Sequence, residues 1–332
     1  MKKVSEVSPR LYHYTTEQGL YGILDNQCLW ATHYKFLNDY SEIILFRDKL
    51  IEFLSPSTLD YLKKLISIHP NAPAHISAMG GRDAVVKSAT EGIVDTLYKV
   101  LSHEIYITSF CGEHTTDDFI NENGLLSQWR AYGGDGGFAV VFKKHELDEM
   151  LRSEYEAFYY DHFLLADMVY SDDEEKYQLE LSKLLHKITP YLQEMLKQLI
   201  EGRAAASNSA GEAFSSFVQC ITRYKHQGFK EEQEFRVVAM PTPPDLVKEL
   251  AEKDSSNLKP EKKREFRDKN GQRTPYIELF KSSLNPPLPL NLLPIEKIIV
   301  GPHKDKETRA TALRIKLRDT DIKVTVSEIP YQ

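Results

Sequence analysis

The feature that most constrains the fold of this chain is the way in which long helical segments interrupt a series of short β-strands. Apolar residues follow a helical pattern through most of residues 46–104 and again from about 173 to 224. The segments around them read as short strands, and several neighbouring strands lack a helix of crossover length between them. Because parallel neighbours need such a crossover, this order favours an α+β fold over a doubly wound parallel sheet.

The domain organisation follows from length and local composition. A chain of 332 residues is long enough for one large domain or two ordinary ones. We predict a single domain over residues 1–332 with a helical insertion at about 173–222. We also predict a solvated loop at about 241–272, where prolines and the charged run EKKREFRDKNGQR occur.

Charge and cysteine usage narrow the functional class. A formal charge of −7 argues against a general electrostatic nucleic-acid binder. The three cysteines, Cys28, Cys111 and Cys220, are far apart and form no CxxC pair, which argues against a structural zinc site or a disulfide framework. No stretch approaches the roughly 18 apolar residues of a membrane span. We therefore expect a cytoplasmic protein without a membrane partner.

The stretch Gln227–Ala239, reading QGFKEEQEFRVVA, places acids directly before an apolar β-forming run. If the strand begins by Glu232, alternation puts the carboxylates of Glu232 and Glu234 on one face, about 6–7 Å apart. Like charges at that distance raise each other's pKa, which is typical of functional sites. The alternative is a solvated acidic edge before a core strand. Arg236 is expected to balance a nearby carboxylate or to bind pyrophosphate in a bidentate manner.

Several catalytic motifs are missing from the sequence. It contains no GxxxxGK[ST] loop, no GxGxxG after a strand, no GxSxG elbow and no HExxH. The histidines and acids near the start match no ligand spacing, so no metal site is predicted. A short helix around Leu125–Tyr132 carries Trp129 and Tyr132 three residues apart on one face, either as core aromatics or as part of a site.

Four segments occur in a particular order along the chain. They are LYHYTT at 11–16, LW with FLNDYSE at 29–42, ITSF … LLSQWRAYGGDGGFAVVF at 107–142, and K-x3-F-x2-E-x-E-F-R at 225–236. This order resembles a bacterial family known as domain of unknown function 2971, from about Leu11 to Gly301. Tyr40 replaces the proline of the family's Asn-Asp-Pro box, and Phe229 and Phe235 replace its two tryptophans.

That family in turn looks like a distant relative of ADP-ribosyltransferases. The resemblance implies a mixed or antiparallel split β-sheet core of ADP-ribosyltransferase-like type with long helical insertions. It also implies NAD as a substrate, transfer of ADP-ribose to an unknown acceptor (protein or nucleic acid), and a role in bacterial conflict or defence. In such chemistry a carboxylate stabilises the oxocarbenium-like state that forms when the nicotinamide–ribose bond breaks.

The resemblance also assigns roles to individual residues. His13 would hold the adenosine-side ribose, and Tyr14 and Thr15 would shape the nicotinamide pocket. Ser109 would support the site, and Trp129 or Tyr132 would stack on the nicotinamide. Glu234 or Glu232 would be the catalytic acid, with Glu234 favoured. Tyr14 stands where the typical transferase has glycine, which puts the backbone contact to the carboxamide in doubt. The alternative function is a module that binds NAD, a related nucleotide or a partner protein without turnover.

Overall fold

The computed structural model describes residues 8–37, 40–100, 104–201, 211–253, 259–269, 271–281 and 292–330. The chain divides into two compact units. The first, the sheet unit, comprises Met1–Phe36, Ile105–Met168 and Gly228–Gln332, and the second, the helical unit, comprises Leu37–Glu104 and Val169–Gln227. The sequence, from which we predicted one domain, did not separate these units.

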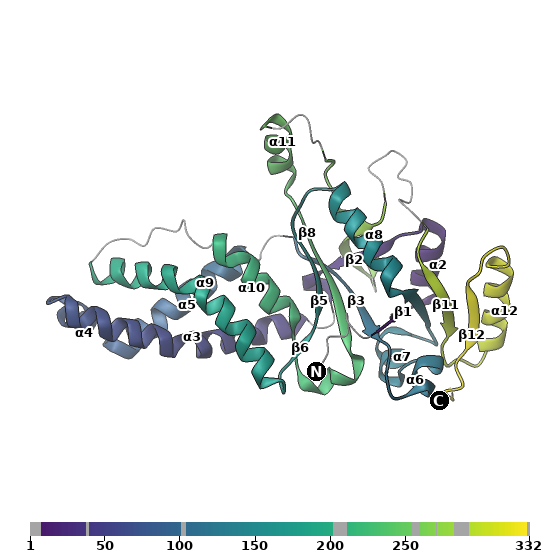
Figure 1. The fold of residues 1–332 in the computed structure, drawn as a ribbon, viewed down its shortest axis with the longest axis horizontal. Helices are drawn as coiled ribbons and strands as arrows, with labels where there is room; N and C mark the ends of the chain where they lie inside the picture. The colour runs from purple at the N-terminus through teal and green to yellow at the C-terminus, as the bar shows by residue number, and fades with distance from the viewer. Residues whose placement is uncertain are drawn as a thin grey trace. The chain divides into compact units, whose positions relative to one another are not determined.

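The sheet unit is built on a ten-stranded sheet (Figure 1). Its strands are β1 (Arg10–Thr15), β2 (Leu29–His33), β3 (Tyr106–Gly112), β4 (Phe138–Lys143), β5 (Tyr160–Asp167), β8 (Glu234–Pro241), β9 (Glu265–Lys269), β10 (Gln272–Leu279), β11 (Ile295–Val300) and β12 (Lys323–Val326). β11 and β12 are parallel, and every other strand pair described in this sheet is antiparallel. The predicted α+β fold with a mixed or antiparallel sheet is therefore confirmed, and the sheet is mixed and mostly antiparallel.

Strand β3 is the branch point of this sheet. Along one edge it pairs with β8 from Tyr106 to Cys111. At the other edge, β1 pairs only with the C-terminal end of β3, at Cys111 and Gly112, and β2 pairs only with its N-terminal end, at Tyr106 and Ile107. The arm β1–β4–β11–β12 and the arm β2–β10–β9 therefore diverge from this second edge. We call the stretch of β3 between them, Thr108–Phe110, the fork.

Two apolar cores flank the sheet. The larger contains Leu11, Phe110 and Phe235 together with apolar residues of α2 (Glu17–Asn26), α8 (Lys144–Ala157) and α12 (Lys306–Lys316). Helix α2 begins after Thr16, whose hydroxyl accepts a hydrogen bond from the Gly19 amide and so satisfies an otherwise unpaired helix N-terminus. The smaller core lies under α7 (Leu126–Tyr132) and α6 (Asp118–Asn123).

The helical unit brings together two segments that are distant in sequence. Its helices are α3 (Tyr40–Ile68), α4 (Ala72–Ala78), α5 (Arg82–Val100), α9 (Glu174–Ile200) and α10 (Gly211–Arg223). Strands β6 (Val169–Tyr170) and β7 (Tyr224–Lys225) pair in parallel. The predicted insertion at about 173–222 is thus helical, as α9 and α10, and it packs on α3 and α5. No helix among the described residues is long and apolar enough to span a membrane.

The segment predicted as a solvated loop, about 241–272, contains regular structure in its described part. Helix α11 (Pro244–Lys253) follows β8, and β9 pairs with β10 as an antiparallel hairpin. The loop prediction was wrong here because β9 is an edge strand, and edge strands carry the charged residues that a sequence pattern assigns to solvent. Asn38 and Asp39, in the FLNDYSE segment, lie outside the described residues.

Candidate functional site

The two predicted acids do not share a strand face. Glu232 is the last residue of a 3₁₀ helix, η2 (Gln227–Glu232), and β8 begins only at Glu234. Between them Gln233 has a φ of 44°, in the left-handed region. A left-handed residue turns the backbone and breaks the alternation on which the prediction depended. The prediction that Glu232 and Glu234 project side by side was therefore wrong.

Glu234 forms a buried ion pair with Arg236. The Arg236 Nε and Nη2 atoms donate to the two carboxylate oxygens of Glu234 at 2.6 and 3.2 Å, and both side chains are 4% exposed. This bidentate geometry fits two residues that are two apart on one strand face. The ion pair corresponds to the first of the two roles predicted for Arg236, that of balancing a nearby carboxylate. Glu232 is also buried, at 8% exposure.

His13 occupies the fork. Its Nδ1 lies 2.9 Å from the Ser109 carbonyl oxygen, and its ring centroid lies 5.6 Å from that of Phe110. Because a carbonyl only accepts hydrogen bonds, Nδ1 carries the proton, and the neutral ring keeps an acceptor lone pair on Nε2. Burial, joined by the positive charge of Arg267, lowers the pKa of His13, although the bond to Ser109 opposes the shift. Of the predicted residues, His13 and Ser109 are thus brought together.

His13 and Glu234 are not brought together by the sheet. Phe235 packs in the larger core, so alternation places its neighbour Glu234 on the opposite face. His13 lies two residues after Leu11 on β1, and alternation therefore places it on the side of the larger core. The charged residue that shifts the pKa of His13 is Arg267, not a glutamate, although the strand register places Arg267 on the opposite face from His13.

Tyr14 and Trp129 are core residues. Their rings pack edge to face at 4.8 Å between centroids, and they are 8% and 5% exposed. The Tyr14 hydroxyl accepts from the Leu125 amide at 2.7 Å, and the Trp129 indole N–H donates to the Asn123 carbonyl at 3.0 Å. The Trp129 ring therefore offers no open face for a nicotinamide. Tyr132, at the end of α7, is partly buried against the same core.

Thr15 ends β1, next to the cap of α2, and is partly exposed. It lies opposite Phe138 of β4. Its position two residues after His13 puts both side chains on the same side of β1. Of the two residues predicted to shape the pocket, Thr15 therefore lies on the His13 side of the sheet, whereas Tyr14 is part of the smaller core.

Sequence reasoning missed Arg267, in β9. Its Nη2 donates to the Thr32 hydroxyl at 2.9 Å, and its guanidinium carbon lies 4.8 Å from the Trp30 ring centroid and 5.6 Å from that of Tyr276. Within the described part of the chain, no carboxylate raises the pKa of Arg267, and its buried Nε has no hydrogen-bond partner. The run EFRDK was assigned to a loop. Its alternation, with Arg267 and Lys269 on one side, was the available signal.

Thr108 adds a hydroxyl to the fork. Its Oγ1 is buried and has no hydrogen-bond partner among the described residues. Buried hydroxyls nearly always have a hydrogen-bond partner, so a buried hydroxyl that lacks one at a gap between strands is unusual. On the side of the larger core, the fork thus combines an imidazole acceptor with a hydroxyl, and both groups can bind ribose hydroxyls. Arg267 lies on the other side of the sheet, because it bonds to Thr32, which alternates with Ala31 of the larger core.

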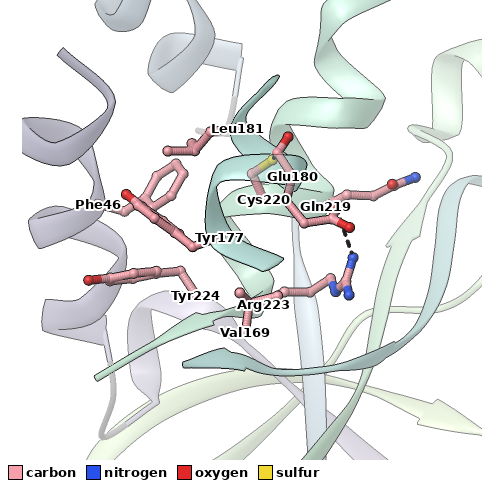
Figure 2. Close-up of a pocket in the computed structure, with 9 residues that line it drawn as sticks. All are labelled: Phe46, Val169, Tyr177, Glu180, Leu181, Gln219, Cys220, Arg223 and Tyr224. Carbon is pink, nitrogen blue, oxygen red and sulfur yellow. Dashed lines mark hydrogen bonds and ion pairs between the residues drawn. The ribbon is translucent and has the colours of Figure 1, made fainter. Parts of the chain in front are cut away.

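A small cavity lies in the helical unit (Figure 2). Its volume is about 10 Å³, room for about one water molecule. Arg223 Nη1 lies 3.2 Å from Glu180 Oε2, and the Cys220 thiol lies 3.6 Å from the Glu180 carbonyl oxygen. Burial raises the pKa of Cys220 to about 12, which keeps this thiol protonated and unreactive at neutral pH. We assign the cavity no substrate.

Among the described residues, no group of three or more His, Cys, Asp or Glu side chains is arranged to hold a metal ion.

Comparison with known proteins gives one match. Residues 128–237 match the family described as "Protein of unknown function (DUF2971)". This segment is what the chain shares with the domain of unknown function 2971 family. The DUF2971 match runs from α7 into β8 and so contains Trp129, Glu232 and Glu234, whereas His13 and Ser109 lie outside it. No curated protein and no solved structure matches the chain.

Proposed function

We propose that this DUF2971 protein is a nucleotide-binding module that takes a ligand of the NAD or ADP-ribose type at the fork without turning it over. The observation that carries the proposal is the imidazole of His13, held between two diverging arms of the sheet by the Ser109 carbonyl. The neutral ring presents Nε2 as an acceptor, and a ribose hydroxyl is a donor of matching strength. In this proposal the binding partner is a nucleotide, and a protein or nucleic-acid acceptor would be needed only if ADP-ribose were transferred.

The state of the predicted acids favours binding over turnover. Stabilising an oxocarbenium-like state needs a carboxylate that can reach the anomeric carbon. Glu234 is 3% exposed and engaged with Arg236, and alternation places it on the sheet face opposite to His13. Glu232 ends a 3₁₀ helix and is almost as buried.

ADP-ribosyl transfer from NAD, in bacterial conflict or defence, is the second candidate. It is supported by the divided sheet with a histidine on its first strand, as expected for an ADP-ribosyltransferase-like core, and by the order of the four sequence segments. Glu234 or Glu232 would then act after a rearrangement that releases one carboxylate. The two candidates differ in whether nicotinamide is released.

The binding proposal is tested by calorimetric titration of ADP-ribose and NAD into the full-length protein and two variants. His13→Gln keeps a donor for the Ser109 carbonyl but replaces the rigid Nε2 acceptor of the ring with a flexible amide oxygen that is displaced from the Nε2 position. His186→Gln, at an exposed position of α9, is the matched control. We expect His13→Gln to weaken ADP-ribose binding by about tenfold, the worth of roughly one hydrogen bond, and the control to bind as wild type. Binding that is equal in all three proteins would contradict the proposal.

The transfer candidate is tested by incubating the protein with NAD and candidate acceptors while nicotinamide release is followed. Glu232→Gln and Glu234→Gln are assayed in parallel. Release that is lost in either variant would establish turnover and overturn the binding-only proposal. If release is absent, or is unchanged in both variants, the transferase candidate is wrong.

A further inference from the structure

We infer that the hydroxyl of Thr108 binds the ribose of the nucleotide together with His13, so that the fork selects a ribose that carries both of its vicinal hydroxyls. The inference rests on the proposed function for the identity of the ligand. It adds a second protein group to the site and a specificity that His13 alone does not provide. No motif in the sequence assigned a role to Thr108.

The Thr108 hydroxyl is buried among side chains of the larger core. The residue opposite Thr108 on β8 is Val237, and its neighbours on the same face of β3 are Tyr106 and Phe110. Among the described residues, Thr108 Oγ1 has no hydrogen-bond partner. Burial of an unpaired hydroxyl costs free energy, and a valine would fill nearly the same space without that cost. Packing alone therefore does not explain a threonine at this position.

One edge of β3 is open at Thr108. On this edge β1 pairs with Cys111 and Gly112, β2 pairs with Tyr106 and Ile107, and no described strand pair includes Thr108. In the described sheet, no strand pair joins β1 directly to β2. The two arms can therefore part at the fork without breaking a ladder hydrogen bond between them, which gives a ligand access to the buried hydroxyl.

His13 and Thr108 lie on the same side of the sheet and next to the same residues of β3. The His13 ring packs on Phe110 at 5.6 Å between centroids, and it bonds to the carbonyl of Ser109, which separates Phe110 from Thr108. Strand positions two apart, such as Phe110 and Thr108, lie about 6–7 Å apart. Hydrogen bonds of ordinary length to two neighbouring ribose hydroxyls can span this separation.

The hydrogen-bonding roles of the two groups match a diol. Nε2 of the neutral His13 ring only accepts, so one ribose hydroxyl donates to it, whereas the Thr108 hydroxyl both donates and accepts and can pair with the other. Thr15 also lies on this side, but its hydroxyl is directed at α2, because a Cβ added at Gly19 would lie 2.0 Å from Thr15 Oγ1. We therefore assign the second ribose hydroxyl to Thr108.

The test is calorimetric titration of ADP-ribose, and of its analogues that lack the 2′ or the 3′ hydroxyl of the adenosine ribose, into wild type, Thr108→Val and Thr325→Val. Thr325 of β12 is the matched control: its Oγ1 is also buried with no hydrogen-bond partner in the described chain, and it lies at the far end of the arm that begins with β1. We expect ADP-ribose binding to weaken about tenfold in Thr108→Val, the worth of roughly one hydrogen bond, and to be unchanged in Thr325→Val.

The analogues identify the contact itself. The analogue that lacks the hydroxyl bound by Thr108 should bind wild type and Thr108→Val equally, because the same hydrogen bond is already lost. The other analogue should still bind Thr108→Val about tenfold more weakly than wild type. If both analogues lose as much affinity in Thr108→Val as ADP-ribose does, Thr108 does not contact the diol and the inference is wrong.

Urea unfolding separates a ligand contact from a packing role. Thr108→Val removes an unpaired buried hydroxyl, so its unfolding midpoint should equal or exceed that of wild type. Thr108→Ser keeps the hydroxyl but loses a buried methyl group, so it should be less stable and still bind ADP-ribose as wild type does. Affinity for ADP-ribose that follows stability across these two variants would show a packing role and overturn the inference.

The outcomes also separate the inference from the proposed function. ADP-ribose binding that is weakened in His13→Gln but unchanged in Thr108→Val leaves the function standing and overturns the role of Thr108. Equal losses in Thr108→Val and Thr325→Val overturn that role as well, since the effect would not be local to the fork. If ADP-ribose does not bind wild type, or binds His13→Gln equally well, the proposed function fails and the inference fails with it.

Discussion

At the scale of single residues, His13 is expected to make stability depend on pH. Burial lowers its pKa in the folded protein, while the unfolded chain titrates near 6.5. The unfolded state then binds the proton more readily, so the stabilising contribution is complete above about pH 6.5 and is lost as the pH falls toward the folded pKa. The relevant window therefore lies below about pH 6.5.

The measurement is urea unfolding of wild type and His13→Gln between pH 8 and pH 5. Burial also lowers the pKa of His114 and His162, but both are present in the two proteins, so the difference between the curves isolates His13. Wild type should lose stability more steeply than the variant on acidification. If the free energies of unfolding of the two proteins fell in parallel with pH, the fork would not hold His13 in its neutral form.

The ion pair between Glu234 and Arg236 makes a second prediction. Glu234→Ala removes the bidentate carboxylate from a buried guanidinium, and breaking such a buried pair costs about 3–5 kcal/mol. Glu231→Ala, at an exposed neighbouring position, should change the free energy of unfolding by less than about 0.5 kcal/mol. Urea unfolding measures both. A neutral or stabilised Glu234→Ala variant would instead indicate a strained catalytic acid.

At this scale the sequence located the acidic stretch but not its geometry. The prediction that Glu232 and Glu234 share a face assumed unbroken alternation. The left-handed φ of Gln233 ends that alternation, and a non-glycine residue gives no local signal for it. Tyr14 and Trp129 show the opposite case: their aromatic spacing was visible, but only burial distinguishes a core pair from a binding surface.

At the scale of elements, Glu154 of α8 connects three other segments. Its carboxylate accepts from the Tyr160 hydroxyl at 2.5 Å and from the Phe280 amide at 2.8 Å, and it pairs with Lys262 at 2.6 Å. Phe280 has a φ of 72°, an unfavourable conformation for a phenylalanine, and the hydrogen bond from its amide to Glu154 helps to hold that conformation. The burial of Lys262 lowers its pKa.

We expect Glu154→Gln to lower the free energy of unfolding by about 3 kcal/mol, since it leaves a buried lysine without a countercharge. Glu156→Gln, at an exposed position of the same helix, should be nearly neutral. Thermal or urea unfolding of the two variants side by side measures the difference. Similar behaviour of both would show that the network does not tie α8 to the sheet.

Most strands of the sheet were recognisable from alternation, because each packs one apolar face on a core. Their pairing was not. The fork exists because β1 and β2 meet opposite ends of one edge of β3, and registers between segments that are distant along the chain leave no local pattern. Strand β9 was assigned to a loop because it is an edge strand whose charged residues are also typical of loops. For the same reason, Arg267 was not recognised from the sequence.

At the scale of the whole molecule, each unit has its own buried interior. Both tryptophans, Trp30 and Trp129, belong to the sheet unit, so their fluorescence reports on that unit alone, whereas far-ultraviolet circular dichroism reports on both. Gly92, inside α5 of the helical unit, has open space where a Cβ would be added. Gly92→Ala should stabilise that helix by about 1 kcal/mol.

If the units unfold separately, Gly92→Ala raises the midpoint of the circular dichroism transition and leaves that of the tryptophan fluorescence transition unchanged. Equal shifts by both probes would show that the two units unfold as one cooperative structure. The sequence indicated the helical segment at 173–222 but not its packing on α3 and α5, since contacts between inserted segments are non-local.

The central claim, that the fork binds a nucleotide through His13, is tested most directly by nitrogen-15 NMR of the histidine rings during titration with ADP-ribose. The His13 signals are assigned with His13→Gln, and the signals of exposed His186 serve as an internal control. We predict that the His13 ring is neutral with its proton on Nδ1, and that ADP-ribose shifts its Nε2 signal while leaving His186 unchanged. Saturation of ADP-ribose binding without any change at His13 Nε2 would contradict the account.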